Sequence, residues 1–221
     1  MPDVRAVWRS RVFEAVWGAA YNYGIEHEWL SAPIGRVVFG SDVRLLYDSL
    51  RVVGEMPDGS AILDMPCGGG LAFRGMRPEQ DVRYVAADIS VSMLDRARRR
   101  AAQLGLDGIE YVETDVESMP FPDAEFDLGV CFNGLHCMPD PAAALVELTR
   151  TLKPGGRLVG DCLIRDVGRS DAYLAALRRL GVFGPGGRLA DVERWLTDAG
   201  LRIDRLERSG ALAHFAATRG V

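Results

Sequence analysis

Short apolar segments alternate with helical patterns along residues 60–164, and this alternation constrains the fold more than any other feature of the chain. The apolar segments predict strands, and helical repeats such as the one at 92–104 separate several of them. Parallel strands need crossovers of this length, with helices on both faces of the sheet. The strands are predicted at 61–65, 82–89, 109–114, 126–132 and 157–164.

The helix boundaries in this region carry their own signals. Ser92 is predicted to cap the helix that ends at Gly105, and Asp140-Pro141 places a cap and a first-turn proline before the next helix. The turn at 153–156 (Lys-Pro-Gly-Gly) is predicted to end that second helix before the fifth strand.

The C-terminal region breaks the alternation. Residues 187–199 are predicted to be helical, and strands at 201–207 and 211–218 are joined only by Ser209-Gly210. So short a connection requires an antiparallel pair. The sequence therefore predicts an α/β, Rossmann-like, mostly parallel seven-stranded sheet with one antiparallel strand near the C-terminus.

Residues 1–55 lie outside the alternation. Helices predicted at 4–18, 26–30 and 42–53 indicate an N-terminal helical cap over the edge of the sheet. We expect a single domain over residues 1–221, with the Rossmann-like core at 56–221. The stretch 165–187 has glycines at both ends of a short helical piece, which is typical of a mobile lid and equally of a surface helix with loops.

The composition of the chain limits which classes of partner molecule it can bind. The 221 residues are 48% hydrophobic and 26% charged with a net charge of −5, and the basic residues are scattered, which argues against nucleic acid. No apolar run is long enough to span a membrane and no secretory signal begins the chain. The four cysteines fit no metal-site spacing, and Cys131 and Cys162 are expected as buried free thiols. A reducing cytoplasm and a small-molecule partner follow, with no particular oligomeric state implied.

The loop after the first strand indicates the ligand. Asp64 ends the strand, and Gly68, Gly69 and Gly70 follow. A Walker-type triphosphate loop requires lysine after the last glycine, and a dinucleotide loop requires glycine where Phe73 stands. S-adenosylmethionine fits better, because a carboxylate suits its ammonium group and glycine amides suit its carboxylate.

Two further acids end the next strands. Asp88 ends the second strand, where it can accept from ribose hydroxyls, and Asp115 follows the third, where it can accept from the adenine amino group. The carboxyl ends of parallel strands meet at one edge of the sheet. Asp64, Asp88 and Asp115 are therefore predicted to surround one ligand.

Residues 60–165 resemble the class I S-adenosylmethionine-dependent methyltransferases, in particular the small-molecule branch that includes ubiquinone and menaquinone biosynthesis enzymes. ILDMPCGGG is similar to the family's glycine loop, with Pro66 in place of the first glycine, and VAADIS to its second motif. The run TDVESMPFPDAEFDLGVCFNGLHCMPDP and the turn LKPGGRLVG are similar to its later motifs. The resemblance implies S-adenosyl-L-methionine as cofactor and S-adenosyl-L-homocysteine as product.

The resemblance also assigns residues to the cofactor. Around the methionine part it places the residues of the first loop, Asp64, Pro66, Gly68, Gly69 and Gly70. Around ribose, adenine and the methyl group it places the following residues: Asp88, Ile89, Ser90, Met93, Asp115, Val116, Glu117 and Asn133.

The segment after the fourth strand bears on the acceptor. It has the sequence Asn133-Gly134-Leu135-His136 and lacks the prolines and tyrosine typical of enzymes that methylate exocyclic amines. We therefore expect O- or C-methylation of a small organic acceptor, with no metal. His136 is a candidate general base, or else a structural residue at the next turn.

Other assignments stay open. Tyr21, Tyr23 and His27 of the cap are candidates to close over the ligand, together with His136. Two other functions compete with small-molecule methylation, namely a non-catalytic S-adenosylmethionine-binding module and a methyltransferase acting on protein or RNA.

Overall fold

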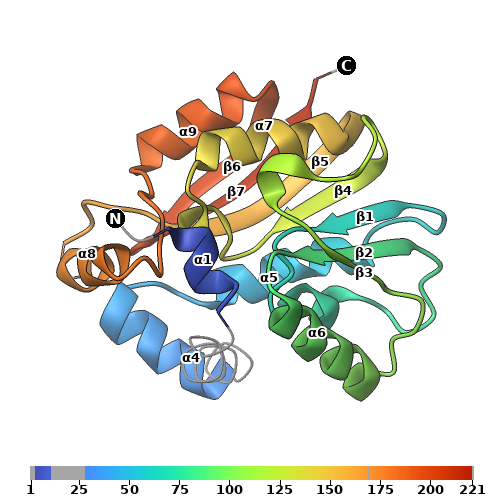
Figure 1. The fold of residues 1–221 in the computed structure, drawn as a ribbon, viewed down its shortest axis with the longest axis horizontal. Coiled ribbons are helices and arrows are strands. Elements are labelled where there is room, and N and C mark those ends of the chain that lie inside the picture. Colours follow the sequence, from blue (N-terminus) through green and yellow to red (C-terminus); the bar gives the residue numbers. More distant parts are fainter. Residues whose placement is uncertain (1–2, 11–27, 169, 221) are drawn as a thin grey trace.

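The computed structural model describes residues 3–10, 28–168 and 170–220 and is built around a seven-stranded sheet (Figure 1). The strands lie in the order β3-β2-β1-β4-β5-β7-β6. Their bounds are β1 Ala61–Asp64, β2 Arg83–Asp88, β3 Glu110–Glu113, β4 Phe126–Cys131, β5 Leu152–Leu163, β6 Leu201–Ser209 and β7 Leu212–Arg219.

Strand directions confirm the predicted architecture. β1 pairs in parallel with β2 and β4, and the outer pairs β2–β3 and β4–β5 are also parallel. β7 runs antiparallel to both of its neighbours, β5 and β6. The strand order reverses between β1 and β4, and open sheets of this type bind ligands beyond the carboxyl ends of the strands at such a point.

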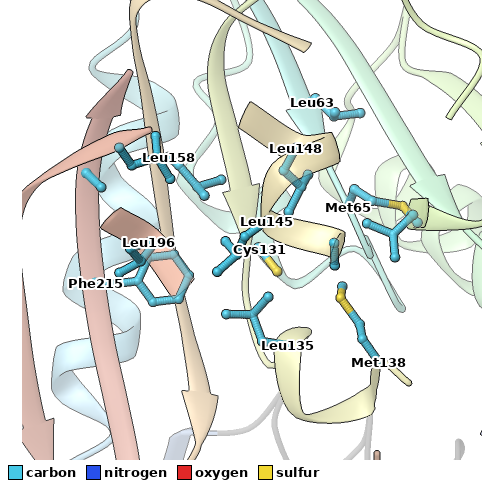
Figure 2. Close-up of a cluster of buried hydrophobic side chains, with 14 of the residues drawn as sticks. Leu63, Met65, Cys131, Leu135, Met138, Leu145, Leu148, Leu158, Leu196 and Phe215 are labelled. Atoms are coloured by element: carbon cyan, nitrogen blue, oxygen red, sulfur yellow. The ribbon is translucent and has the colours of Figure 1, made fainter. Parts of the chain in front are cut away.

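Helices cover both faces of the sheet. α7 (Pro141–Thr151) and α9 (Leu189–Asp198) pack on one face, where Leu145, Leu148 and Leu196 meet Phe215 in one hydrophobic cluster (Figure 2). α5 (Arg44–Gly54) and α6 (Val91–Leu104) pack on the other face. The apolar stripes of these helices explain why the strands between them are apolar on both sides.

The predicted helix caps were partly correct. Asp140 caps α7 by accepting from the backbone N–H groups of Ala142 and Ala143, with Pro141 in the first turn, as expected. α6 begins two residues earlier than predicted, because Ser90 rather than Ser92 accepts from the N–H of Met93. β5 also begins earlier, at Leu152, so the expected turn at 153–156 lies inside the strand.

The N-terminal segment differs from a cap placed over an edge. It contains α1 (Val4–Trp8), α4 (Glu28–Ile34) with a π-helical turn at Gly35–Phe39, and α5. Leu50 and Val53 of α5 belong to the buried core, so this helix covers a face of the sheet. The remainder of the predicted first helix, residues 11–18, lies outside the described residues.

The cysteines, the helix lengths and the segment 165–187 were also subjects of prediction. Cys131 and Cys162 are buried free thiols, as predicted. Every helix within residues 3–10, 28–168 and 170–220 is too short or too polar to cross a bilayer. The segment 165–187 contains α8 (Asp171–Arg179), and its status as a lid stays a prediction.

Candidate functional site

A cavity opens at the carboxyl ends of β1, β2 and β4, where the sheet topology places a ligand site. Its empty volume is about 1140 Å³ when the open mouth is included. Ten predicted site residues line it: Pro66, Gly68, Gly69, Asp88, Ile89, Met93, Asp115, Val116, Asn133 and His136. The fold thus brings together residues from four separate strand ends.

The loop after β1 brings bare backbone to the cavity wall. Gly68 and Gly70 have φ values of 51° and 79°, the left-handed region that glycine adopts without strain. A Cβ on Gly68 would meet nothing within 4 Å, whereas one on Gly70 would lie 2.5 Å from the Phe73 ring. Gly68 therefore leaves room beside the cavity, and Gly70 allows the loop to pack on the core.

Asp88 organises the loop from the end of β2. One carboxylate oxygen accepts from the N–H of Gly68 and the other from the N–H of Ser90, both at 2.9 Å. The side chain is 95% shielded from solvent and yet lines the cavity. An ionised carboxylate has about four lone-pair sites, so accepting these two N–H groups is compatible with accepting from a ligand hydroxyl as well.

Asp115 lies opposite, at the turn after β3. It accepts from the N–H of Glu117 at 3.1 Å, and its carboxylate forms an ion pair with Arg5 of α1 at 2.7 Å. Arg5 also pairs with Glu117 at 2.5 Å, which turns the Glu117 side chain to α1. The two carboxylates hold the guanidinium at the rim of the cavity.

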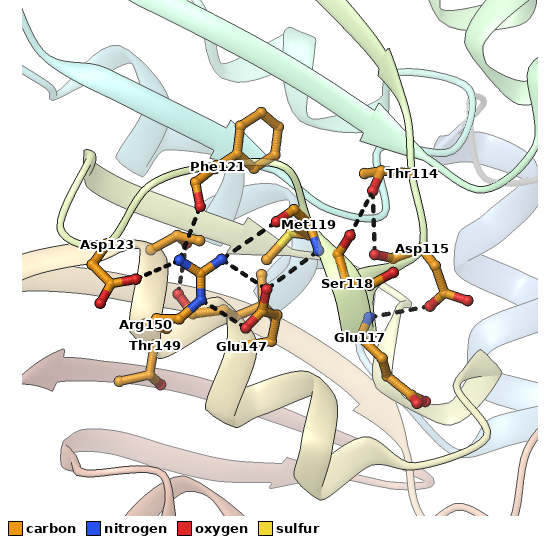
Figure 3. A network of polar contacts seen from close by, with 12 residues as sticks. Thr114, Asp115, Glu117, Ser118, Met119, Phe121, Asp123, Glu147, Thr149 and Arg150 are labelled. Carbon is orange, nitrogen blue, oxygen red and sulfur yellow. Dashed lines mark hydrogen bonds and ion pairs between the residues drawn. The ribbon is translucent and has the colours of Figure 1, made fainter.

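The segment that follows this turn, from Met119 to Asp123, is anchored by Arg150 of α7 (Figure 3). The guanidinium donates to the carbonyl of Phe121 at 2.9 Å and to the carboxylates of Asp123 and Glu147 at 2.6 and 2.7 Å. Hydrogen bonds to these two carboxylates raise the pKa of Arg150 further above its ordinary value. Glu147 in turn accepts from the N–H of Met119, so the whole loop is tied to α7.

Asn133 ends the fourth strand region with a φ of 53°, and the chain turns there into the cavity wall. Its N–H donates to Asp161 of β5 at 2.8 Å. The next residue, Gly134, has no space for a side chain, because a Cβ would lie 2.6 Å from both Pro66 and Cys131. This close packing joins the β1 loop to the β4 turn.

His136 lines the cavity as a buried, neutral imidazole. Its Nδ1 accepts from the N–H of Leu163 at 3.2 Å, so the ring proton is on Nε2. Burial lowers its pKa to about 3, and the ring packs edge-on against Phe183 with centroids 4.7 Å apart. The geometry weighs against His136 as the predicted general base. Its unprotonated nitrogen, Nδ1, already accepts the hydrogen bond from Leu163.

Four predicted cofactor residues do not line the cavity. Asp64 is buried beneath it, accepts from the hydroxyl of Tyr84 at 2.9 Å, and has its pKa raised to about 8 by burial. Its predicted contact with an ammonium group, directly or through its water shell, stays a prediction. Gly70, Ser90 and Glu117 serve the loop, the α6 cap and the α1 ion pair instead.

Part of the predicted lid lies outside the described residues, namely Tyr21, Tyr23 and His27. Within residues 3–10, 28–168 and 170–220, no three His, Cys, Asp or Glu side chains gather as a metal ion would require.

The sequence reasoning missed the apolar cover of the cavity. Trp8 of α1 donates its indole N–H to the carbonyl of Val182 at 2.9 Å, so α1 and the segment after α8 meet. The lining residues that were not predicted are Val4, Arg5, Trp8, Met65, Cys67, Leu71, Phe132, Gly134, Cys137, Met138, Pro139, Val182 and Phe183. Their hydrophobicity was visible in the sequence, but only their common position identifies them.

Comparisons with known proteins agree with this geometry. A family model described as a methyltransferase domain matches residues 63–160. The chain is 31% identical over 198 residues to 27-O-demethylrifamycin SV methyltransferase of Amycolatopsis mediterranei (strain S699), covering 76% of this chain and 72% of that protein. It is 41% identical over 101 residues to demethylmenaquinone methyltransferase of Clavibacter sepedonicus, covering 46% of this chain and 40% of that one.

A solved structure extends the similarity to the fold. Geranyl diphosphate C-methyltransferase from Streptomyces coelicolor A3(2), in complex with Mg²⁺, geranyl diphosphate and S-adenosyl-L-homocysteine, superimposes with a TM-score of 0.64. The match covers 80% of this chain and 81% of that one at 17% identity, so it concerns the arrangement of the elements alone.

Proposed function

The chain belongs to the class I S-adenosylmethionine-dependent methyltransferases, and from this membership we propose that it methylates a carbon or oxygen atom of a small, largely apolar organic acceptor. The observation that carries the proposal is the cavity itself. It joins the glycine loop, Asp88 and Asp115 to apolar residues of α1 and of the segment after α8.

The residues present fit the cofactor. Asp88 lines the cavity, where its carboxylate would accept from the ribose hydroxyls. The open space beside Gly68 admits the amino-acid end of the ligand against the backbone. Asp115 and Val116 would flank the adenine ring, with Arg5 beside them.

When bound, the cofactor supplies a methyl group that its sulfonium already activates. The protein must then hold the acceptor in line and keep water out, which is how positioning accelerates such a transfer. Trp8, Met138 and Phe183 provide apolar walls for that purpose. His136 offers its Nε2–H as a hydrogen-bond donor toward a polar atom of the acceptor, since its Nδ1 is occupied.

The wider assignments belong to the same proposal. We treat residues 1–221 as one methyltransferase domain and 165–187 as a lid, supported by the hydrogen bonds from Trp8 to Val182 and from Gly184 to the carbonyl of His136. A cytoplasmic location is supported by the four free cysteines. An apolar cavity and a net charge of −5 favour a small molecule over nucleic acid.

Binding tests the cofactor assignment. We expect S-adenosyl-L-homocysteine to raise the melting temperature, and NAD to leave it unchanged. Asp88→Ala should weaken S-adenosyl-L-homocysteine binding about 10- to 100-fold, because a hydrogen bond to a charged group is worth about 1.5–3 kcal/mol. Asp88→Asn keeps the shape of the side chain without its charge, so its affinity for S-adenosyl-L-homocysteine should fall less than that of Asp88→Ala. Unchanged affinity in calorimetry of Asp88→Ala would refute the ribose assignment.

Turnover tests the reaction class. Labelled S-adenosylmethionine incubated with metabolite extracts should transfer its methyl group to an organic-soluble product with the label on carbon or oxygen. Binding of the cofactor without any labelled product would favour the non-catalytic module. Label recovered in protein or RNA would favour the macromolecular alternative.

A further inference from the structure

A buried carboxylate and a buried imidazole face each other behind the cavity wall. Asp161 of β5 and His214 of β7 are direct partners in the antiparallel register, and both have an exposed fraction of 0%. Asp161 Oδ2 lies 3.8 Å from His214 Nδ1. This distance exceeds a hydrogen bond, so the two side chains pack against each other without one.

Asp161 connects this pair to the cavity. Its other oxygen, Oδ1, accepts from the N–H of Asn133 at 2.8 Å. Asn133 lines the cavity in the left-handed conformation, which residues with a side chain rarely adopt and which asparagine tolerates better than most. The carboxylate therefore holds the one peptide that shapes this part of the wall.

The polar groups of this cluster are under-satisfied. Among the described residues, Asp161 Oδ2, Asn133 Nδ2 and both ring nitrogens of His214 have no hydrogen-bond partner although all four atoms are buried. Buried polar groups without partners destabilise a fold, and an apolar pair between β5 and β7 would avoid that loss. A role in shaping the site explains why polar side chains stand here.

Charged and titratable side chains approach the Asp161–His214 pair from β6 and from the neighbouring strands. On the same face of β6, Arg205 and Glu207 lie beside β7, with Glu207 directly opposite His214 in register. Arg205 donates to Ser49 of α5 at 2.9 Å and opposes protonation of His214. On the sheet side the titratable neighbours of Asp161 are Cys131 and Cys162, whose thiols remain protonated.

We propose that Asp161 is a positioning residue for methyl transfer, holding the Asn133 peptide in its left-handed conformation, and that His214, its partner across the strands, helps to keep that carboxylate out of water. An ionised carboxylate is a stronger acceptor than a carboxylic acid, so the wall is held more firmly as Asp161 loses its proton. Burial raises the pKa of Asp161 to about 7 and lowers that of His214 to about 4. The ionisation of Asp161 thus falls near neutral pH, where the imidazole of His214 is uncharged.

The backbone amide of Asn133 reports this directly by NMR in the cofactor-free protein. We expect its proton resonance to move downfield with one titration between pH 5.5 and 8.5. The titration should vanish in Asp161→Asn, because the amide does not titrate. An Asn133 amide that does not respond to pH in the wild-type protein would overturn the proposal.

Cofactor affinity separates positioning from a general loss of structure. Asp161→Asn can still accept from the Asn133 N–H, so it should bind S-adenosylmethionine within about two-fold of wild type but without the pH dependence. Asp161→Leu should bind S-adenosylmethionine about ten-fold more weakly than wild type. Wild-type affinity in a folded Asp161→Leu variant would contradict the inference, and if that variant does not fold, the Asp161→Asn titration still decides.

Asp127 supplies the matched control. It also accepts a backbone N–H from a neighbouring strand, that of Ala61 at 2.9 Å, but at the opposite end of β4. Asp127→Asn should change neither the Asn133 titration nor the affinity. The inference rests on the proposed function only for its link to methyl transfer. If the amide titrates and S-adenosylmethionine does not bind, the proposed function fails while the Asp161 contact stands.

Discussion

At the scale of single residues, the site depends on which glycines and which carboxylates face the cavity. Asp88 accepts two backbone N–H groups and still faces the cavity, whereas Asp64 is buried against Tyr84. Both end a strand and both follow an apolar run, so their sequence contexts are alike. The tertiary surroundings alone separate a carboxylate that faces the cavity from one that is buried beneath it.

Gly68 and Gly70 allow a matched pair of substitutions. Gly68→Ala should cost about 1–2 kcal/mol of stability for its positive φ, and its methyl group should weaken S-adenosyl-L-homocysteine binding at the cavity wall. Gly70→Ala should cost about 2–4 kcal/mol, because a Cβ 2.5 Å from Phe73 adds overpacking to the same strain. Urea unfolding and calorimetry measure both effects. A Gly68→Ala variant that binds normally would contradict the placement of Gly68.

At the scale of elements, the cavity is held together by contacts between segments that are distant in sequence. α7 carries Arg150, which fixes the loop after β3, and α1 carries Arg5 and Trp8, which reach Asp115 and Val182. These helices therefore pack against the loops that line the cavity. The conformation of these loops follows from the helices against which they pack.

Arg150→Ala should release the loop that carries Asp115. We expect a loss of about 1–3 kcal/mol in stability, since several hydrogen bonds to a charged, mostly buried side chain disappear. Affinity for S-adenosyl-L-homocysteine should fall with it. Arg51→Ala is the control, because its ion pair with Asp48 is highly exposed and should contribute less than about 0.5 kcal/mol. Equal stabilities of the two variants would argue against an anchoring role for Arg150.

At the scale of the whole molecule, four buried titratable groups couple stability to pH. Burial raises the pKa of Asp64 to about 8 and of Asp161 to about 7, and lowers that of His136 to about 3 and of His214 to about 4. The two acids bind protons more tightly in the folded chain, so their stabilisation is lost as pH rises through these values. The histidines act in the opposite sense, but their effect fades above about pH 6.5, because the imidazoles of the unfolded chain then lose their protons as well.

The acids therefore act alone above neutrality, and the free energy of unfolding should fall by about 1–3 kcal/mol between pH 6.5 and 8. Urea titrations at the two pH values measure this change. Asp64→Asn should flatten the dependence, because the amide does not titrate. A wild-type protein equally stable at both pH values would show that these carboxyls ionise normally.

The sequence by itself determined the sheet, its one antiparallel strand and the meeting of Asp88, Asp115 and Asn133 at one edge. Periodicity and connection length decide strand direction, and parallel strands carry their carboxyl ends to the same place. The start of α6 was misplaced by two residues because Ser90 and Ser92 are equivalent cap candidates when only the local sequence is considered.

Only the tertiary structure decided what lies above and behind that edge. The cover by Arg5 and Trp8, the tautomer of His136 and the pairing of Asp161 with His214 all join segments far apart in the chain. The physical reason is that local patterns record which face of an element is apolar. Which polar groups then meet in the interior depends on strand register and packing, which no local pattern contains.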